Sequence, residues 1–134
     1  MKYLLDTCTV SDFVKGEINT LNRLKSTPPS EIAISSITVM EIEYGLSLNP
    51  SVMKKIKMML NEFMEIITIL DYTQDDASQS ALVRALLKQQ GSPIGSYDIL
   101  LAGVALNHKT IFVTSNTKEF ERVNGLKLEN WRNG

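Results

Sequence analysis

The chain has 134 residues, of which 43% are hydrophobic and 22% are charged, an ordinary balance for a globular protein with a core. Fourteen basic residues against fifteen acidic ones give a net charge of -1, so the chain as a whole lacks the basic excess of many nucleic-acid-binding domains, although a local basic rim can coexist with an acidic centre. The single cysteine, Cys8, excludes an internal disulfide, and no apolar run approaches the roughly 18 residues of a membrane span. We therefore expect one soluble cytoplasmic domain over residues 1–134, with no membrane partner.

Short strands rich in β-branched and apolar residues alternate with helical segments along the chain. In chain order, the pattern predicts a strand at 3–5, helices at 8–16 and 20–25, a strand at 32–35, helices at 36–48 and 51–64, a strand at 66–70, helices at 73–90 and 97–108, a strand at 110–114, a helix at 116–123 and an edge strand at 126–128. Gly16, Asn49-Pro50 and Gly91 mark helix ends, and Thr73 begins a Thr-x-x-Asp helix start. This alternation predicts an α/β sandwich around a mainly parallel sheet.

Asp6 follows the first predicted strand directly. In open α/β sheets, ligands bind in the crevice outside the carboxyl ends of the strands, which is where this carboxylate is expected to lie. Asp is also a good N-cap for the helix that follows. Position alone therefore leaves a ligand role and a capping role open for Asp6.

Glu41 lies in the segment SSITVMEIEYGL, on the same side of the predicted helix as Ile37, Tyr44 and Leu48. The helix is apolar on nearly every side, which predicts that it is well buried. A buried carboxylate is costly unless it is paired or coordinates a metal. The alternative is a glutamate at a partly exposed seam, paired with a lysine.

Asp98 enters an apolar helix in the segment GSPIGSYDILLAGVAL. A negative charge in the first turn suits the helix dipole, which is the simplest explanation of this residue. However, no other charge follows until Lys109, and Asp98 shares its face with Ala102 and Ala105, which leave room beside it. This pattern favours a site at the rim of the core.

A fourth polar turn follows the predicted strand at 110–114, in the segment VTSNTKEF. Asn116 and Glu119 fit a capping box, with Asn116 in the N-cap place and Glu119 three residues later. The turn also opens at the carboxyl end of a strand, so its polar side chains are expected near Asp6, Glu41 and Asp98.

Together these residues predict an oxygen-rich site without a thiolate or histidine cluster. Such sites suit hard cations such as Mg²⁺ or Mn²⁺. Carboxylates held close together repel one another unless a divalent ion neutralises them. A bound divalent ion can activate water and stabilise an in-line phosphoryl displacement.

Four segments of this chain resemble the PIN-domain ribonucleases, and most closely the VapC toxins of bacterial toxin–antitoxin pairs. They are LLDTCTVSDFVKG, SSITVMEIEYGL, GSPIGSYDILLAGVAL and TIFVTSNTKEFERVNGLKLENW, and they cover almost the whole chain in the family's order and spacing. The resemblance implies a PIN-like three-layer α/β/α sandwich over residues 1–134. It also implies an endoribonuclease that requires Mg²⁺ or Mn²⁺.

The family's acidic residues match this chain residue by residue, with one departure. Asp6, Glu41 and Asp98 match the first three acids, which implies that they are the catalytic and metal-binding residues. The fourth acidic position of many PIN domains falls on Asn116, an amide. Outer-shell help from Glu119 and from the hydroxyls of Ser115 and Thr114 is therefore expected.

The residue at position 8 is a second difference from the family. Many relatives have Asn where this chain has Cys8. We interpret Cys8 as a small buried residue and not as a ligand.

The resemblance also implies partners. The expected substrate is tRNA or ribosomal RNA, with the anticodon loop of initiator tRNA one candidate. A VapB-like antitoxin is expected to block the acidic pocket with an Arg or Lys of its tail. A homodimer and a toxin–antitoxin hetero-oligomer are expected, with apolar helix surface around Met53, Met58 and Met59 at the dimer interface.

Other protein classes share some of these features. A non-catalytic PIN fold that binds RNA or protein draws on Asn116. A receiver domain would use Asp71 as its phosphoacceptor, but the acidic pair after the first strand and the lysine after the last are missing. A haloacid-type phosphatase would need an acid at Cys8, and a Cys8–His108 nucleophilic pair has no supporting motif.

The aromatic and basic residues outside these motifs have simpler explanations. We interpret Tyr44, Tyr97 and Trp131 as core or interface residues and not as base-stacking platforms. The lysine run at 54, 55 and 57 is interpreted as a solvated helix face.

Overall fold

Five short parallel strands form the centre of the protein in a computed structural model, which describes residues 1–48, 50–51 and 54–134. The strands are β1 (Tyr3–Leu5), β2 (Ile32–Ser35), β3 (Thr68–Leu70), β4 (Ile111–Val113) and β5 (Lys127–Glu129), and their order in the sheet is β3-β2-β1-β4-β5. Every neighbouring pair is parallel, and Tyr3 of β1 lies in register with Ile32 and Ile111. The prediction of a mainly parallel α/β sheet is confirmed.

The strand order places a reversal in the middle of the sheet. Strands β2 and β3 follow one another on one side of β1, whereas β4 and β5 lie on its other side. Ligands of open α/β sheets bind at such a switch point, outside the carboxyl ends of the strands. Asp6, which follows β1, and Thr114, which follows β4, border this crevice from its two sides.

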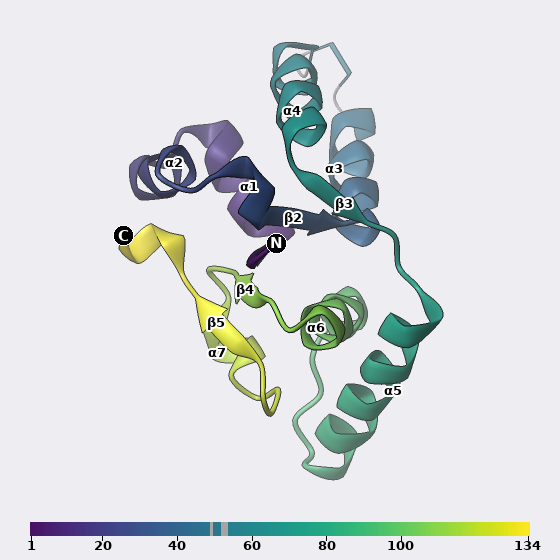
Figure 1. Ribbon diagram of the computed structural model, residues 1–134. Helices are drawn as coiled ribbons and strands as arrows, with labels where there is room; N and C mark the ends of the chain where they lie inside the picture. Colours follow the sequence, from purple (N-terminus) through teal and green to yellow (C-terminus); the bar gives the residue numbers. More distant parts are fainter. Residues whose placement is uncertain (49, 52–53) are drawn as a thin grey trace.

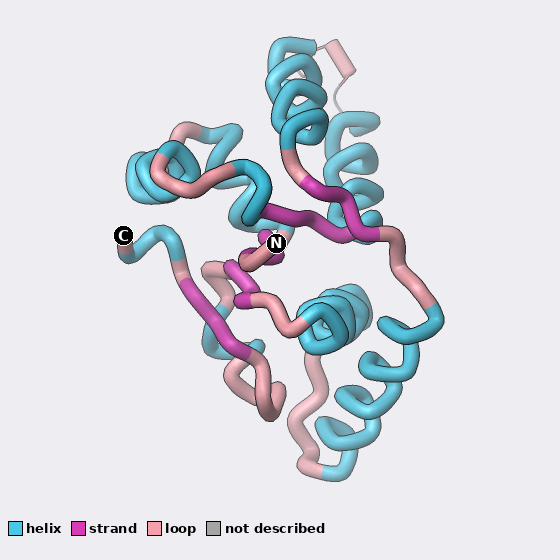
Figure 2. Tube along the Cα trace, in the orientation of Figure 1, coloured by secondary structure: helices cyan, strands magenta, loops and turns pink. Residues whose placement is uncertain are grey.

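Helices cover both faces of the sheet, which gives three layers (Figure 1). They are α1 (Thr7–Lys15), α2 (Ile18–Lys25), α3 (Ser36–Leu48), α4 (Lys54–Ile66), α5 (Gln74–Gln89), α6 (Ser96–His108) and α7 (Thr117–Phe120), with 3-10 turns η1 (Pro29–Glu31) and η2 (Trp131–Asn133). Figure 2 shows the strands running between the two groups of helices. None of the helices in the described ranges combines the length and apolar character that crossing a membrane requires.

Alternate residues of the strands supply two separate hydrophobic cores. Leu4 and Phe112 face α5, α6 and α7, whereas Leu5 and Val113 face α1, α4 and η2. Successive side chains of a strand point to opposite faces, so short runs that are apolar throughout are what a sheet covered on both sides requires.

Helices α5 and α6 approach each other closely. At Gly103 of α6, an added Cβ would lie 1.9 Å from Oγ of Ser80 and 2.8 Å from the backbone oxygen of Asp76. Glycine is therefore needed there for the two helices to approach. This contact fixes α6, whose first turn carries Asp98, against the rest of the fold.

Several predicted boundaries differ from the structure. Helix α2 begins at Ile18 and not at residue 20, because the carboxylate of Glu17 caps it by accepting from the backbone N–H groups of Asn19 and Thr20. Helix α4 continues to Ile66, so β3 starts later than predicted. Two predicted features lie outside the described residues. They are the helix end marked by Asn49, and residues 52–53 near the start of the helix predicted at 51–64.

The last predicted helix is also shorter in the structure. Helix α7 spans only Thr117–Phe120 instead of 116–123, and the backbone then passes through turns to β5.

Candidate active site

Asp6 both caps a helix and faces the crevice. It is 7% exposed, and its Oδ1 accepts a hydrogen bond from the backbone N–H of Thr7 at 2.7 Å, at the start of α1. Its Oδ2 accepts from the hydroxyl of Thr114 at 2.9 Å. Burial raises the pKa of Asp6, although the hydrogen bonds from Thr114 and Thr7 oppose that rise. The capping role and a site role, which the sequence left as alternatives, are therefore compatible.

Cys8 connects the turn after β1 to the turn after β4. Its sulfur lies 3.4 Å from Oδ2 of Asp6 and accepts from the backbone N–H of Ser115 at 3.4 Å and from the Ser115 hydroxyl at 3.3 Å. The residue is half-buried, so the expectation of a buried side chain is wrong. Because α1 starts at the crevice, its first turn keeps this thiol partly open to solvent.

Glu41 reaches the crevice from α3 and is anchored by α1. Its Oε1 accepts a hydrogen bond from the hydroxyl of Thr7 at 2.8 Å. Thr7 was not singled out from the sequence, although it directly follows Asp6. One short stretch of chain thus positions two of the candidate carboxylates.

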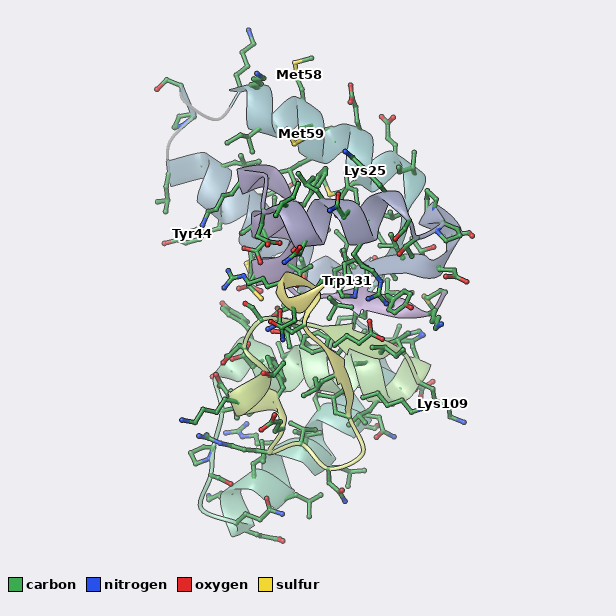
Figure 3. The ribbon with its side chains drawn as sticks, turned by 90° about the vertical axis from the view of Figure 1, so that its left-hand side faces the viewer. Lys25, Tyr44, Met58, Met59, Lys109 and Trp131 are labelled. Atoms are coloured by element: carbon green, nitrogen blue, oxygen red, sulfur yellow. The ribbon has the colours of Figure 1, made fainter. Side chains whose placement is uncertain are left out.

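The prediction that α3 is well buried is wrong. Thr38 is its only buried residue, while Met40, Tyr44 and Leu48 are 40%, 64% and 62% exposed. These three side chains repeat every fourth residue and form one apolar stripe, which we call the α3 stripe. Figure 3 shows Tyr44 extending away from its helix at the edge of the molecule. Apolar residues on every side predicted burial, but neighbours cover only one side of this helix.

The carboxyl groups of Asp98 and Glu119 lie next to each other on the other side of the crevice. Burial raises the pKa of Asp98 to about 7, and the negative charge of Glu119 adds to the rise. The charges of Asp6 and, more weakly, Glu41 act in the same direction. Glu119, Asp6 and Glu41 therefore all lie close enough to Asp98 to raise its pKa.

The backbone at Gly95 completes this side of the site. A Cβ added at Gly95 would lie 2.9 Å from Oδ2 of Asp98, so a larger residue would displace the carboxyl group. The N–H of Gly95 donates to Oε1 of Glu119 at 3.0 Å. The role of this glycine was missed in the sequence, where its position three residues before Asp98 was the available signal.

The predicted capping box at Asn116 and Glu119 is wrong. Asn116 occupies the N-cap position, but its side chain makes no capping hydrogen bond. Its amide instead donates to Oε2 of Glu119 at 2.6 Å, and its backbone N–H donates to the hydroxyl of Thr114 at 3.0 Å. Because a glutamate bound by Asn116 and Gly95 cannot also reach back to cap the short helix, the turn orients Glu119 toward Asp98. The N–H of Gly95 and the amide of Asn116 lower the pKa of Glu119.

The donor atoms of the site suit a hard cation, but they are not arranged as a closed set of ligands. Within the described ranges, no three His, Cys, Asp or Glu side chains are grouped as metal ligands. The carboxylates of Asp6, Glu41 and Glu119 instead each accept a hydrogen bond from a donor of the protein. Carboxylate and hydroxyl oxygens are nevertheless the ligands that Mg²⁺ and Mn²⁺ prefer.

His108 lies far from this site, so the Cys8–His108 pair is excluded. Asp98 is in the first turn of α6 and His108 in the last, which separates them by about 15 Å at 1.5 Å per residue. Nε2 of His108 lies 3.6 Å from Oδ1 of Asp76, a buried residue of α5. His108 therefore belongs to the α5–α6 contact.

Comparisons with known proteins identify relatives along nearly the whole chain. A family model described as PIN domain matches residues 3–126. The chain is 34% identical over 131 residues to the tRNA(fMet)-specific endonuclease VapC of Shigella flexneri, with 98% of each chain covered. It is 36% identical over 132 residues to ribonuclease VapC2 of Haemophilus influenzae, again with 98% of each covered.

Solved structures agree with the sequence comparisons. The fold matches a chain in the crystal structure of DNA-bound VapBC from Salmonella typhimurium, with a TM-score of 0.89, 32% identity and 98% of each chain covered. A chain in VapBC2 from Rickettsia felis, bound to a fragment of promoter DNA, matches with the same TM-score of 0.89 and 32% identity over 98% of this chain and 99% of that one.

Proposed function

The chain belongs to the PIN-domain family as a VapC-type ribonuclease, and within that family we propose that it is the toxin of a toxin–antitoxin pair and cleaves RNA with Mg²⁺ or Mn²⁺. The observation that carries the proposal is the convergence of Asp6, Asp98, Glu119 and Glu41 on one crevice at the switch point of the sheet. Burial raises the pKa of Asp98 to about 7, and the negative charges of Glu119, Asp6 and Glu41 add to the rise, as expected for acids that share one crevice.

In this proposal Asp6, Glu41 and Asp98 are the catalytic residues and would hold the metal. A bound divalent ion would supply an activated water and neutralise charge on the phosphodiester. Asp98 has to lose its proton before it can serve as a ligand, and the negative charge of Glu119 opposes that loss because it raises the pKa of Asp98. Glu119 supplies a fourth acid, whereas many PIN domains have theirs at the position of Asn116.

The remaining polar groups orient these acids. Thr114 holds Asp6 and the backbone of Asn116, while Ser115 is tied to Cys8. With one histidine in the chain, no histidine pair can act as acid and base for attack by a 2′-hydroxyl. The expected products therefore carry a 5′-phosphate and a 3′-hydroxyl.

Cleavage of RNA by the purified protein tests the proposal. Asp6→Asn and Asp98→Asn are each expected to lower the rate by at least about a thousandfold, which corresponds to about 4 kcal/mol of transition-state stabilisation. Asp75→Asn, on the exposed first turn of α5, is the matched control and should cleave like the wild type. A chelator should stop cleavage and added Mg²⁺ or Mn²⁺ should restore it. Products that end in a 2′,3′-cyclic phosphate would contradict this mechanism.

The proposed substrate is initiator tRNA, cut in the anticodon loop. The support is the similarity over 98% of the chain to a relative named as a tRNA(fMet)-specific endonuclease. Sequencing of RNA ends after brief induced expression tests it. Ends that map to ribosomal RNA or to other tRNAs would replace this target while leaving the ribonuclease activity intact.

The proposed partner is a VapB-like antitoxin, because chains of this fold are found in VapBC complexes. An Arg or Lys of the antitoxin is the expected plug for an acidic pocket, since a guanidinium pairs with carboxylates in a bidentate way. If an antitoxin that lacks its tail neutralised the toxin equally well, direct plugging would be the wrong account.

A homodimer is also proposed, and the structure modifies the expected interface. Met58 is exposed and Met59 is half-buried, while Met53 lies outside the described residues. The α3 stripe, which is larger and continuous, is the better candidate surface. Light scattering of wild type and Tyr44→Glu tests it, and a dimer in both would remove the stripe from the interface.

A further inference from the structure

The loop between α5 and α6 borders a groove next to the acidic crevice. Its volume is about 790 Å³. One wall is a single face of α5, formed by Ala77, Ala81, Arg84 and Lys88 at helical spacing, and the other carries Ile94 and Tyr97. The two alanines keep the groove open, and the two cations lie together toward one end of the helical face.

The groove and the crevice meet at the first turn of α6. Tyr97, Asp98 and Ile99 follow one another there. Tyr97 and Ile99 line the groove, whereas Asp98 lies beside Glu119 in the crevice. Consecutive helical residues point about 100° apart, so one turn of helix presents its carboxyl group to the crevice and its aromatic ring to the groove. A chain that occupied the groove would continue directly to Asp98.

The charges of the groove are opposite to those of the crevice. Arg84 and Lys88 are both exposed, and at a spacing of four residues their Cβ atoms lie about 6 Å apart. Within the described ranges neither side chain takes part in an ion pair. Tyr97 is 52% exposed, so it is not a core residue, contrary to one part of the interpretation from the sequence. An acidic site repels a polyanion, and these cations offer the attraction that the chain's net charge of -1 does not.

We propose that this groove binds the single-stranded RNA flanking the cleaved bond, with Arg84 and Lys88 on its phosphates and Tyr97 stacked on a base. Single-stranded nucleic acid is bound by this combination of a basic groove and an aromatic platform. The inference rests on the proposed ribonuclease function and adds to it a substrate-binding surface outside the acidic crevice.

Binding of a short fluorescein-labelled single-stranded RNA to protein with the Asp6→Asn background tests the groove. Arg84→Glu with Lys88→Glu should weaken binding at least tenfold at about 50 mM salt and make the slope of log affinity against log salt shallower by about 1.4, or about 0.7 per lost phosphate contact. The matched control is Lys55→Glu with Lys57→Glu, which changes the net charge equally on exposed residues of α4, at the opposite end of the molecule (Figure 1). The control should bind within about twofold of its parent.

The aromatic platform has its own test. Tyr97→Ala should weaken binding at least about fivefold, whereas Tyr97→Phe, which keeps the ring, should bind like its parent. In cleavage assays without the background substitution, the groove variants should raise KM and leave kcat unchanged. If the double glutamate variant is unstable in thermal unfolding, Arg84→Ala with Lys88→Ala is measured for the same loss of salt slope.

Each alternative outcome overturns a different statement. Equal RNA binding by the α5 and α4 double variants would refute the proposal that the groove binds RNA. Cleavage of RNA by the wild type would still support the ribonuclease function. Equal RNA binding together with a changed oligomeric state would assign the groove to a protein interface instead. A wild type that cleaves no RNA would refute the proposed function, whereas the groove would still be decided by the binding measurements.

Discussion

Helices α3 and α6 each have 13 residues and are apolar on nearly every side, yet they differ in how far they are buried. In α6 the whole run 101–105 is buried, whereas α3 buries only Thr38. Small residues at Ala102, Gly103 and Ala105 let α5 pack closely on α6. The glycine of α3, Gly45, faces open space, with no atom within 4 Å of an added Cβ.

This difference divides the candidate site into two halves. Asp98 projects from a helix that is fixed by close packing, and Glu119 is held by two further hydrogen bonds. Glu41 projects from a helix with an uncovered apolar stripe and depends on Thr7. We therefore expect that a partner covering α3 would affect the Glu41 side of the site more than the Asp98 side.

Leucine truncation in the two helices should give the largest contrast. Leu101→Ala removes a fully buried side chain and should lower the free energy of unfolding by about 3 kcal/mol. Leu48→Ala, on the exposed stripe, should change it by less than about 0.5 kcal/mol in dilute protein. Urea unfolding measures both. A loss at Leu48 that grows with protein concentration would show that a second copy covers the stripe.

Alanine substitution of the two glycines should give effects of opposite sign. Gly103→Ala forces α5 and α6 apart, because backbone atoms of Asp76 and Ser80 lie 2.8 Å from the new Cβ, and should cost about 2 kcal/mol. Gly45→Ala meets no obstacle and should stabilise α3 by up to about 1 kcal/mol through helix propensity. Thermal unfolding of both variants is the measurement. Equal tolerance at the two positions would contradict the close helix contact.

The Asp98 half of the site should have a pH signature in metal-free protein. Its pKa is raised from 3.8 to about 7, so the folded protein holds a proton that the unfolded chain has lost. The stability from this proton is fully present below about pH 4 and is lost as the pH rises through about 7. Asp98→Asn cannot ionise, and should therefore melt higher than the wild type by a larger margin at about pH 8 than at about pH 5.

Thermal unfolding in a chelator, at those two pH values, tests this signature. Asp75→Asn is again the control, because its carboxyl group is exposed. The shift should be a few degrees, since Asp98 is only partly buried and solvent screens its charge. A difference of equal size at both pH values would mean that ionisation of Asp98 is not its cause.

The Glu41 half of the site should respond least. Thr7→Val removes the hydroxyl that donates to Glu41 and should cost about 1 kcal/mol, while Thr7→Ser keeps the donor and should be close to neutral. Crystallography of the valine variant should show Glu41 in a new position with Asp98 unmoved. An unchanged Glu41 would show that α3 alone is enough to fix it.

Much of the candidate site could be proposed from local sequence signals. The signals were acids and an amide at the carboxyl ends of strands or at the starts of helices, namely Asp6 after β1, Asp98 in the first turn of α6 and Asn116 after β4. The structure brings these residues to one crevice. The contacts that orient them could not be proposed in the same way. Thr7 and Gly95 look ordinary in the sequence, because their importance lies in which distant side chain they meet.

By itself, the sequence determined the elements and their alternation, since strand and helix signals depend on residues close together in the chain. β1, β2, α3 and α6 were predicted to within one residue of their observed ends. Tertiary structure alone decided which of two equally apolar helices is buried, because burial depends on which surfaces meet. Tertiary structure also decided the role of Asn116, which was predicted to cap a helix but donates to Glu119 instead. The reason is that a polar side chain forms its hydrogen bond with the partner that the fold brings into reach.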